Sequence, residues 1–257
     1  MPEPLYQQVA RDLRKKIEEG RLRPGAKLPS QAQLEKDYGI STNTARLAIG
    51  VLVNDGLVES RQGQGSFVRN QVPFTALMSA EEGVRKGSDR DAFVAAVQVK
   101  GRTPAQRGFA MRLEVATPEV AASLGITEGD TVVVRSMERL IDGQAWSLQT
   151  SYYPYELAKG TGLMSPQDLP HGTITELARH GHEQRGYRDH IVTRMPEPDE
   201  SGFFDRGAGV PVAQVSRTAF SDDGRPIRLT VTVYAGDMTH LAYEIGDVPA
   251  TVEELTP

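Results

Sequence analysis

The sequence predicts an α+β protein with a small helical N-terminal domain closed by a β-hairpin and a larger C-terminal domain built on an antiparallel sheet. Residues 5–54 place apolar side chains at the three-to-four-residue spacing of helices, with turn residues between the segments. From about Ala105 the chain changes to short β-rich runs, and Asp-Gly turns separate two pairs of these runs.

The composition is that of an ordinary globular protein, and 257 residues are enough for two domains. There is no cysteine, which excludes disulfides, thiolate zinc sites and cysteine nucleophiles. No apolar run reaches about 20 residues, and no secretion signal is recognisable at the N-terminus. We therefore expect a cytoplasmic protein without a membrane partner.

The charge is divided unevenly along the chain. Residues 1–70 hold 11 Lys and Arg against 8 Asp and Glu, a net +3, whereas the remaining residues hold 18 against 26, a net −8. A basic N-terminal part on an acidic body is expected if only the N-terminal part meets phosphate.

The first helix is predicted over residues 5–17, because apolar residues recur every four positions before Gly20. The apolar stripe consists of Leu5, Val9, Leu13 and Ile17, with Tyr6 beside it. The other faces carry the cations Arg11, Arg14, Lys15 and Lys16. Two interpretations of these cations stay open, a solvated surface and contact with phosphate.

Two further short helices are predicted on either side of a glycine turn. Ser30 is an N-cap, with Gln33 three residues later as in a capping box, and the helix ends at Gly39. Ser41 caps a third helix that runs to Asp55-Gly56. This arrangement is typical of a helix-turn-helix, whose second helix enters the major groove by its N-terminal end. The side chains placed there to reach bases or phosphates are Thr42, Asn43, Thr44 and Arg46.

A β-hairpin is predicted directly after this motif. Residues 57–61 and 66–68 have strand character, and Gln62-Gly63-Gln64-Gly65 forms a tight turn between them. Glycines let such a turn approach a sugar-phosphate edge or the minor groove closely. Together with the helices, the hairpin indicates a winged helix-turn-helix; a winged helix used only for protein contact is the alternative.

The N-terminal segment resembles the DNA-binding domain of the GntR family of bacterial regulators. The supporting residues are Tyr6, Pro24-Gly25, Leu28-Pro29-Ser30, Ile40-Ser41, Thr44, Arg46, Ala48, Gly56-Leu57-Val58 and Gln62 through Val68. The family often has an arginine at the positions of Ala32 and Thr42, so this chain lacks two cations that act on DNA there. The expected DNA-binding residues are Ser30, Gln31, Ser41, Thr42, Asn43, Thr44, Arg46, Arg61, Gly63, Gln64 and Gly65.

The C-terminal part contains a weak internal repeat. Strands are expected at 132–134, 145–153, 190–195, 212–220 and 227–234, and short helices at Pro118–Leu124 and Thr173–Gly181. Leu124, Gly129, Val132 and Asp142-Gly143 are matched by Phe204, Gly209, Val212 and Asp223-Gly224. Two similar helix–strand–turn–strand units predict two related lobes, and a cleft between lobes is a natural ligand site.

This part also resembles the UTRA domain, which follows the GntR head in HutC-type regulators. The supporting stretches are Gly129-Asp130-Thr131-Val132, Glu138-Arg139, Asp142-Gly143, Tyr152-Tyr153-Pro154, Gly172-Thr173-Ile174, Gly209 to Arg217, Tyr234 and Asp237. The resemblance implies a chorismate-lyase-like fold, a homodimer formed through this domain, and a small-molecule effector. It also implies the effector-binding residues Arg139, Gln149, Ser151, Thr173, Thr175, Arg228 and Tyr234.

Two departures from the family pattern concern the effector. Members that bind sugar phosphates commonly have an arginine pair where this chain has Met137-Glu138-Arg139, so one cation is missing. Arg228 stands where many members keep an acid. One cation is thus lost near Arg139 and another is gained at position 228. We therefore hypothesise that the effector carries an anionic group, placed differently from the phosphate of the sugar-phosphate-binding members. For Trp146, on a neighbouring strand, cleft lining and core packing both stay open.

The sequence offers no pattern of catalytic residues. His180-x-His182 could bind a metal on a strand, but its surroundings predict a helix end with two surface histidines. Nucleophile-elbow, P-loop and Rossmann motifs are absent. We expect no catalytic residue, no metal and no cofactor; an enzyme with an accessory DNA-binding head and a ligand-free architectural DNA-binding protein are the competing classes.

These observations lead to one expected organisation. Residues 1–70 form the DNA-binding domain, residues 71–95 a linker with at most a short helix, and residues 96–257 the effector-binding and dimerisation domain. We expect a transcription regulator, a repressor in its action, that binds a palindromic operator as a homodimer and is released or modulated by its effector.

Overall fold

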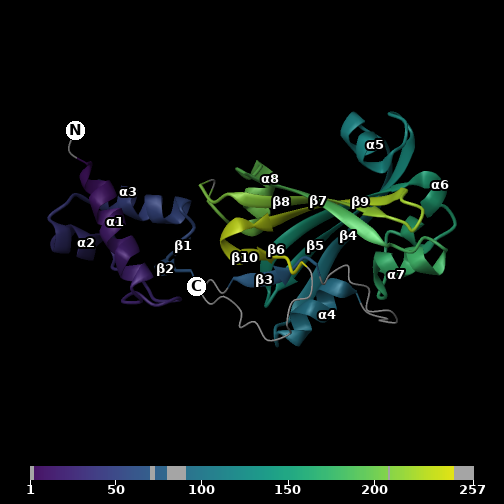
Figure 1. Ribbon diagram of the computed structural model, residues 1–257. Coiled ribbons are helices and arrows are strands. Elements are labelled where there is room, and N and C mark those ends of the chain that lie inside the picture. Colours follow the sequence, from purple (N-terminus) through teal and green to yellow (C-terminus); the bar gives the residue numbers. More distant parts are fainter. Residues whose placement is uncertain (1–2, 70–72, 80–90, 208, 246–257) are drawn as a thin grey trace. The chain divides into compact units, whose positions relative to one another are not determined.

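The computed structural model of the chain describes residues 3–69, 73–79, 91–207 and 209–245 (Figure 1). It combines a helical N-terminal domain with a large antiparallel sheet and its covering helices, which confirms the α+β class. Within the described residues, no helix is both long and apolar enough to span a bilayer.

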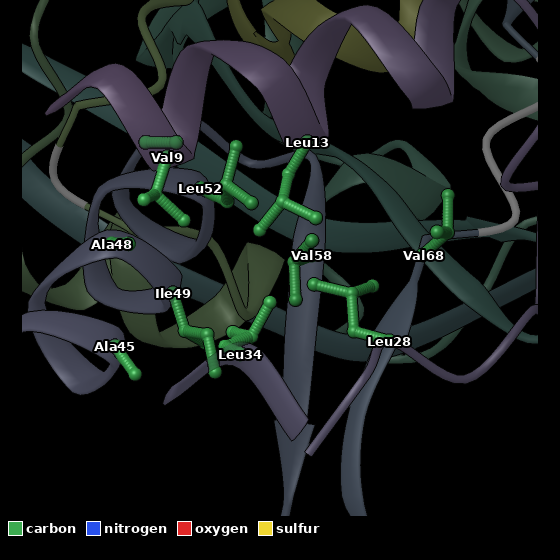
Figure 2. Close-up of a cluster of buried hydrophobic side chains, with 11 residues drawn as sticks. Val9, Leu13, Leu28, Leu34, Ala45, Ala48, Ile49, Leu52, Val58 and Val68 are labelled. Atoms are coloured by element: carbon green, nitrogen blue, oxygen red, sulfur yellow. The ribbon is translucent and has the colours of Figure 1, made fainter. Parts of the chain in front are cut away.

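The N-terminal domain contains the three helices and the hairpin that the sequence predicts. They are α1 (Leu5–Glu18), α2 (Gln31–Tyr38), α3 (Thr42–Asn54), β1 (Val58–Arg61) and β2 (Gly65–Val68). Their apolar faces meet in one core, shown in Figure 2: Val9, Leu13, Leu28, Leu34, Ala45, Ala48, Ile49, Leu52, Val58 and Val68. Leu5, expected in the apolar stripe, is 59% exposed, because the stripe contributes to the core only from Val9 onward.

The helix ends follow the predicted capping residues. Ser30 Oγ accepts from the Gln33 amide at 3.2 Å, and Gly39 ends α2 in the left-handed conformation with φ 64°. The Gln33 side chain donates to Asp37 at 2.6 Å, which differs from the predicted capping box. Ser41 caps α3 as expected.

The four cations of α1 are paired on the protein surface. Arg11, Lys15 and Lys16 lie within 3.8 Å of carboxylates on or next to α1, and Arg14 pairs with Asp55. These contacts favour the solvated interpretation of this face. Such exposed pairs contribute at most about 1 kcal/mol each to stability.

Six strands of the described C-terminal residues form one sheet in the order β4-β5-β6-β9-β8-β7. Their bounds are β4 (Pro104–Val115), β5 (Thr131–Ile141), β6 (Gln144–Pro154), β7 (Gly186–Arg194), β8 (Val212–Phe220) and β9 (Pro226–Ala235). β5 runs antiparallel to β4 and to β6, and the predicted turn at Asp142-Gly143 joins β5 to β6. β7 begins at Gly186, four residues before the expected start.

The described helices of this part are short. They are α5 (Pro118–Leu124), α6 (Tyr155–Ala158), α7 (Gly172–Arg179) and α8 (Pro198–Phe204), with 3-10 turns η1 (Gly162–Met164) and η2 (Gly236–Met238). α5 packs on one face of the sheet through Leu124, against Val132 and Val134. α6, η1 and α7 pack on the opposite face, where Val133 and Tyr153 point.

The internal repeat is visible in the order of elements. α5, β5 and β6 follow one another as helix, strand, turn and strand, and α8, β8 and β9 repeat the sequence. Leu124 and Phe204 are each 2% exposed, and the first strand of each unit has a buried valine at its start, Val132 as the second residue of β5 and Val212 as the first residue of β8. The second strands of the two units, β6 and β9, are neighbours in the sheet.

Two short strands were not expected from the sequence, and the short helix allowed in the linker extends past its expected end at residue 95. β3 (Phe74–Leu77) pairs in parallel with β10 (Thr239–Ala242), and α4 (Ala92–Val99) follows later in the segment expected to be a linker. Residues 80–90 of that segment lie outside the described part. Arg217 attaches the end of β3 to the sheet: it donates to the Met78 carbonyl at 3.0 Å and pairs with Asp189 at 2.6 Å.

Candidate functional site

The first turn of α3 presents a polar surface. Ser41 Oγ accepts from the Thr44 amide at 3.2 Å and lies 2.9 Å from Thr44 Oγ1, so both hydroxyls help to fix this end of the helix. Thr42, Asn43 and Arg46 are exposed. The Arg46 guanidinium donates to Asn43 Oδ1 at 2.9 Å. An amide and a guanidinium held together at a helix N-terminus can bind base edges and phosphates.

The position of this turn follows from the burial of the other face of α3. Ala45, Ala48, Ile49 and Leu52 are 8% exposed or less (Figure 2). Since a helix repeats every 3.6 residues, burying these four leaves Asn43 and Arg46 on the outer side. The helix is therefore anchored by its core face and free to present its polar side chains.

The β1–β2 turn forms the predicted wing. Gly63 and Gly65 have φ of 71° and 110°, a region that favours glycine. Phe67 on β2 lies between two cations, with the Arg61 guanidinium 4.6 Å and Lys27 Nζ 5.9 Å from its ring centroid. The sequence analysis missed Lys27, and its position in the turn-rich connector was the available signal. In the structure, a β-bridge between Lys27 and Phe67 joins this connector to the wing.

The predicted DNA-binding residues fall in three places on the N-terminal domain. Ser30 and Gln31 start α2, the residues from Ser41 to Arg46 start α3, and the last four lie on the wing. All are exposed except Thr44, which is half-buried. Ser30 Oγ is engaged as the helix cap, and Arg61 also pairs with Glu59 at 2.8 Å.

Three of the predicted effector residues share one face of the C-terminal sheet, which we call the effector face: Arg139, Gln149 and Ser151. Opposite residues of paired strands point the same way, and the register places Arg139 opposite Ser147 and Met137 opposite Gln149. Ser151 Oγ lies 3.0 Å from Thr230 Oγ1, which puts Thr230 of β9 beside this face.

Arg228 and Tyr234, the two predicted effector residues of β9, are both buried. Arg228 is 5% exposed and donates to Gln184 Oε1 at 2.9 Å. Tyr234 is 1% exposed. A guanidinium presents several N–H donors in a fixed geometry, which suits the binding of an anionic group.

The other two predicted residues, Thr173 and Thr175, lie on α7, which covers the same face through Leu177. Glu176 of α7 is 6% exposed; its carboxylate accepts from His171 at 2.8 Å and from the Gly162 amide at 2.5 Å. Burial alone would raise the pKa of Glu176, but these hydrogen bonds and the nearby histidines lower the pKa below its ordinary value. Glu176 thus joins α7 to η1.

Arg139 is surrounded by residues that the sequence reasoning did not identify. Its guanidinium lies 4.7 Å from the Phe93 ring centroid and 3.9 Å from Asp91 Oδ1. Both residues come from the start of α4. No signal in the sequence connected this segment to the sheet, because it was expected to be linker.

Trp146 is part of the core and sits at an irregularity of β6. Arg139 pairs with Ser147 and Leu140 with Ala145, so Trp146 is the extra residue of a β-bulge. Its ring is stacked on Phe93 at 5.3 Å and meets the edge of Phe74 at 5.3 Å. At 2% exposure, Trp146 supports Arg139 through Phe93 and does not line an open surface.

Arg135 is a buried cation of the effector face that the sequence analysis did not single out. It is 4% exposed, and it donates to the carbonyls of Leu163 at 3.1 Å, Gln167 at 2.6 Å and Ser165. Burial lowers the pKa of Arg135, with nearby acidic groups opposing the shift. This arginine therefore holds the η1 loop against the effector face and is not available to a ligand.

In the described residues, no group of three or more His, Cys, Asp or Glu side chains is placed to hold a metal ion. His180 caps the C-terminal end of α7, and its Nδ1 lies 2.9 Å from the Glu176 carbonyl. This agrees with the expected helix end at Arg179-His180-Gly181-His182.

Comparison with known proteins connects both surfaces to a family. Residues 5–68 match the family described as bacterial regulatory proteins, gntR family, and residues 100–240 match the UTRA domain. The transcriptional repressor NagR of Bacillus subtilis is 28% identical over 251 residues, covering 92% of each chain. The regulator GgaR of Escherichia coli is 23% identical, covering 91% of this chain and 88% of its own.

Solved structures show the same relationship. A GntR-family transcriptional regulator of known structure has 28% identity and a TM-score of 0.63, covering 96% of this chain and 99% of its own. PhnF from Mycobacterium smegmatis has 21% identity and a TM-score of 0.59, covering 93% and 99%, which supports the fold. The matches describe a DNA-binding regulator with a ligand-binding domain, not an enzyme. The chain belongs to the GntR family of bacterial transcription regulators, in the HutC-type group that carries a UTRA effector domain.

Proposed function

We propose that the protein is a repressor that binds a palindromic operator as a homodimer and leaves it when an effector binds the C-terminal domain. The observation that carries this proposal is the exposed Asn43–Arg46 pair at the start of α3, next to a glycine-tipped hairpin. NagR is named as a repressor, which supports repression by this protein over activation. The two DNA-binding domains of a symmetric dimer would occupy operator half-sites about one helical turn of DNA apart.

The DNA part of the proposal is tested with a selected operator. Binding of the full-length protein to a random duplex library should select inverted half-sites, and ultracentrifugation should find two chains per duplex. Arg46→Ala should weaken binding to the selected duplex at least tenfold. Arg185→Ala is the matched control, since Arg185 is an exposed cation of the C-terminal domain paired with Glu183. Selection of a single half-site by a monomer, or equal losses in both variants, would contradict the proposal.

The effector part assigns ligand binding to the effector face together with Thr173, Thr175 and Arg228. An effector that binds one conformation more tightly shifts the protein toward it and so changes operator affinity. We propose that the effector carries an anionic group that Arg228 binds. A thermal-shift screen of sugar phosphates and organic acids identifies candidates, and Arg228→Ala should weaken the best hit at least tenfold. Unchanged affinity in this variant would remove the assignment of Arg228.

A further inference from the structure

Asp91, the N-cap of α4, brings a carboxylate into the surroundings of Arg139. Its Oδ1 accepts from the amides of Phe93 at 3.0 Å and Val94 at 3.4 Å, and from Gln106 Nε2 at 3.3 Å. Arg139 Nη2 lies 3.9 Å from the same oxygen. The first turn of α4, an amide side chain and a guanidinium therefore converge on one internal anion.

Arg139 and its neighbour on β6 are incompletely satisfied. Arg139 is 7% exposed, and its Nε has no hydrogen-bond partner among the described residues. Ser147, opposite Arg139 in the register, is fully buried, and within the same described residues its Oγ also lacks a partner. Buried polar groups are normally hydrogen-bonded, so two such atoms side by side indicate a place that a ligand completes.

The second oxygen of Asp91 is available for that ligand. Every hydrogen bond that the described residues make to this carboxylate uses Oδ1. Oδ2 faces the start of α7, where a Cβ added to Gly172 would lie 3.3 Å from it. Gly172 also has φ 77°, so glycine is favoured at this close approach, and the next residue is the predicted effector residue Thr173.

Helix amides and an arginine are the groups that bind a phosphate or carboxylate ligand. Here Asp91 already fills that arrangement and cancels the charge of Arg139. The Asp91 carboxylate would repel a second anion, whereas a hydrogen-bond donor of a ligand could donate to Asp91 Oδ2. The local charge balance thus selects against one ligand class and for another.

We propose that Asp91 is an internal carboxylate that occupies the anion subsite beside Arg139, so that this end of the effector face excludes phosphate and accepts an ammonium or hydroxyl group of the effector. This inference rests on the proposed function only in assigning effector binding to this face. It places the donor groups of the effector at Asp91, while its anionic group belongs at Arg228.

Inorganic phosphate is the probe that tests the inference. Calorimetric titration of the full-length protein should give a phosphate Kd at least tenfold tighter for Asp91→Asn than for the unsubstituted protein. Asparagine keeps the capping oxygen and the size of the side chain and removes the charge. The gain should vanish in Asp91→Asn combined with Arg139→Gln.

Asp142→Asn is the matched control, because Asp142 also accepts from a backbone amide, that of Thr103 at 2.8 Å, and pairs with Arg102. It should leave phosphate binding unchanged. Asp91→Ser, a second capping residue without charge, repeats the test if the asparagine variant is poorly folded. Equal phosphate affinity in the unsubstituted and Asp91→Asn proteins, or a gain that persists without Arg139, would overturn the inference.

The donor class is tested with glucosamine, which carries an ammonium and hydroxyls but no anion. The inference expects glucosamine to bind the unsubstituted protein at least tenfold more tightly than Asp91→Asn; equal binding would overturn this part. Operator binding is measured separately on the same preparations. Failure to select any operator would remove the proposed function, whereas the phosphate titrations report on the subsite alone.

Discussion

Replacing Phe93 with alanine should remove the contact that joins α4 to the effector face. Phe93 is 2% exposed, lies nearly parallel to Trp146 with an interplanar angle of 14°, and supports the Arg139 guanidinium. Truncating a buried phenylalanine costs about 3–5 kcal/mol. The stacked ring pair accounts for about 0.5–1.5 kcal/mol of this and the cation contact for about 0.5–1 kcal/mol.

Trp146 makes the assay specific, because it is the single tryptophan of the chain. Its fluorescence in a urea titration follows the C-terminal domain without a signal from the N-terminal domain. Phe93→Ala should lower the free energy of unfolding of this domain by about 4 kcal/mol and shift the emission to longer wavelength as water reaches the indole. Phe93→Leu keeps most of the volume and should lose about 1.5 kcal/mol.

Val99→Ala is the matched control on the same helix. Val99 is 72% exposed, so its truncation should change the free energy of unfolding by less than about 0.5 kcal/mol. A loss below about 1 kcal/mol for Phe93→Ala, with unchanged emission, would refute the packing of α4 on Trp146. The proposal for Asp91 would then lose its structural basis as well.

Two further predictions concern Glu176 and Ser41. The pKa of Glu176 is lowered in the folded protein, so its charge stabilises the fold above the unfolded pKa of about 4.3, and this contribution disappears as the pH falls through the folded pKa. Glu176→Gln should therefore lower Tm at pH 6–7, and this difference should shrink as the pH falls below about 4; a pH-independent difference would contradict this. Ser41→Ala should cost about 1 kcal/mol by losing the α3 cap, measured by far-UV circular dichroism, and an unchanged Tm would argue against the cap.

The N-terminal domain could be predicted almost completely because its signals are local. Ser30, Gly39 and Ser41 set the helix ends through capping bonds that span only a few residues. The Asp142-Gly143 turn is equally local, with both residues at positive φ. Such features depend on the residues themselves, so sequence reasoning finds them without knowing the rest of the fold.

The elements that were missed, or expected only in part, depend on distant partners. β3 has four residues, and its parallel partner β10 begins 165 positions after it, at Thr239 opposite Phe74. α4 has an apolar sequence without a clear helical stripe, and it is stabilised by Phe93 and Val97, both buried. Tertiary packing decides these elements, and no pattern within them reveals the partner.

The effector face was predicted in part for the same reason. Arg139, Gln149 and Ser151 could be placed from the resemblance, and the strand register brings them to one face. Asp91 could not, since its role depends on a contact between α4 and the sheet. The sequence described Arg139 as a remaining phosphate-binding cation, whereas the structure gives it a carboxylate partner at 3.9 Å.

These contacts bear on where the effector-binding unit begins. The UTRA match starts at residue 100, and the sequence placed the start of the domain at residue 96. Both positions exclude Phe74, Asp91 and Phe93, which contact Trp146 or Arg139. A fragment cut there would expose the indole and leave the Arg139 guanidinium without its counter-charge, and an unpaired buried charge is costly. If the proposed effector site is correct, a fragment that binds effector must include β3 and α4, because these elements complete the packing around Trp146 and Arg139.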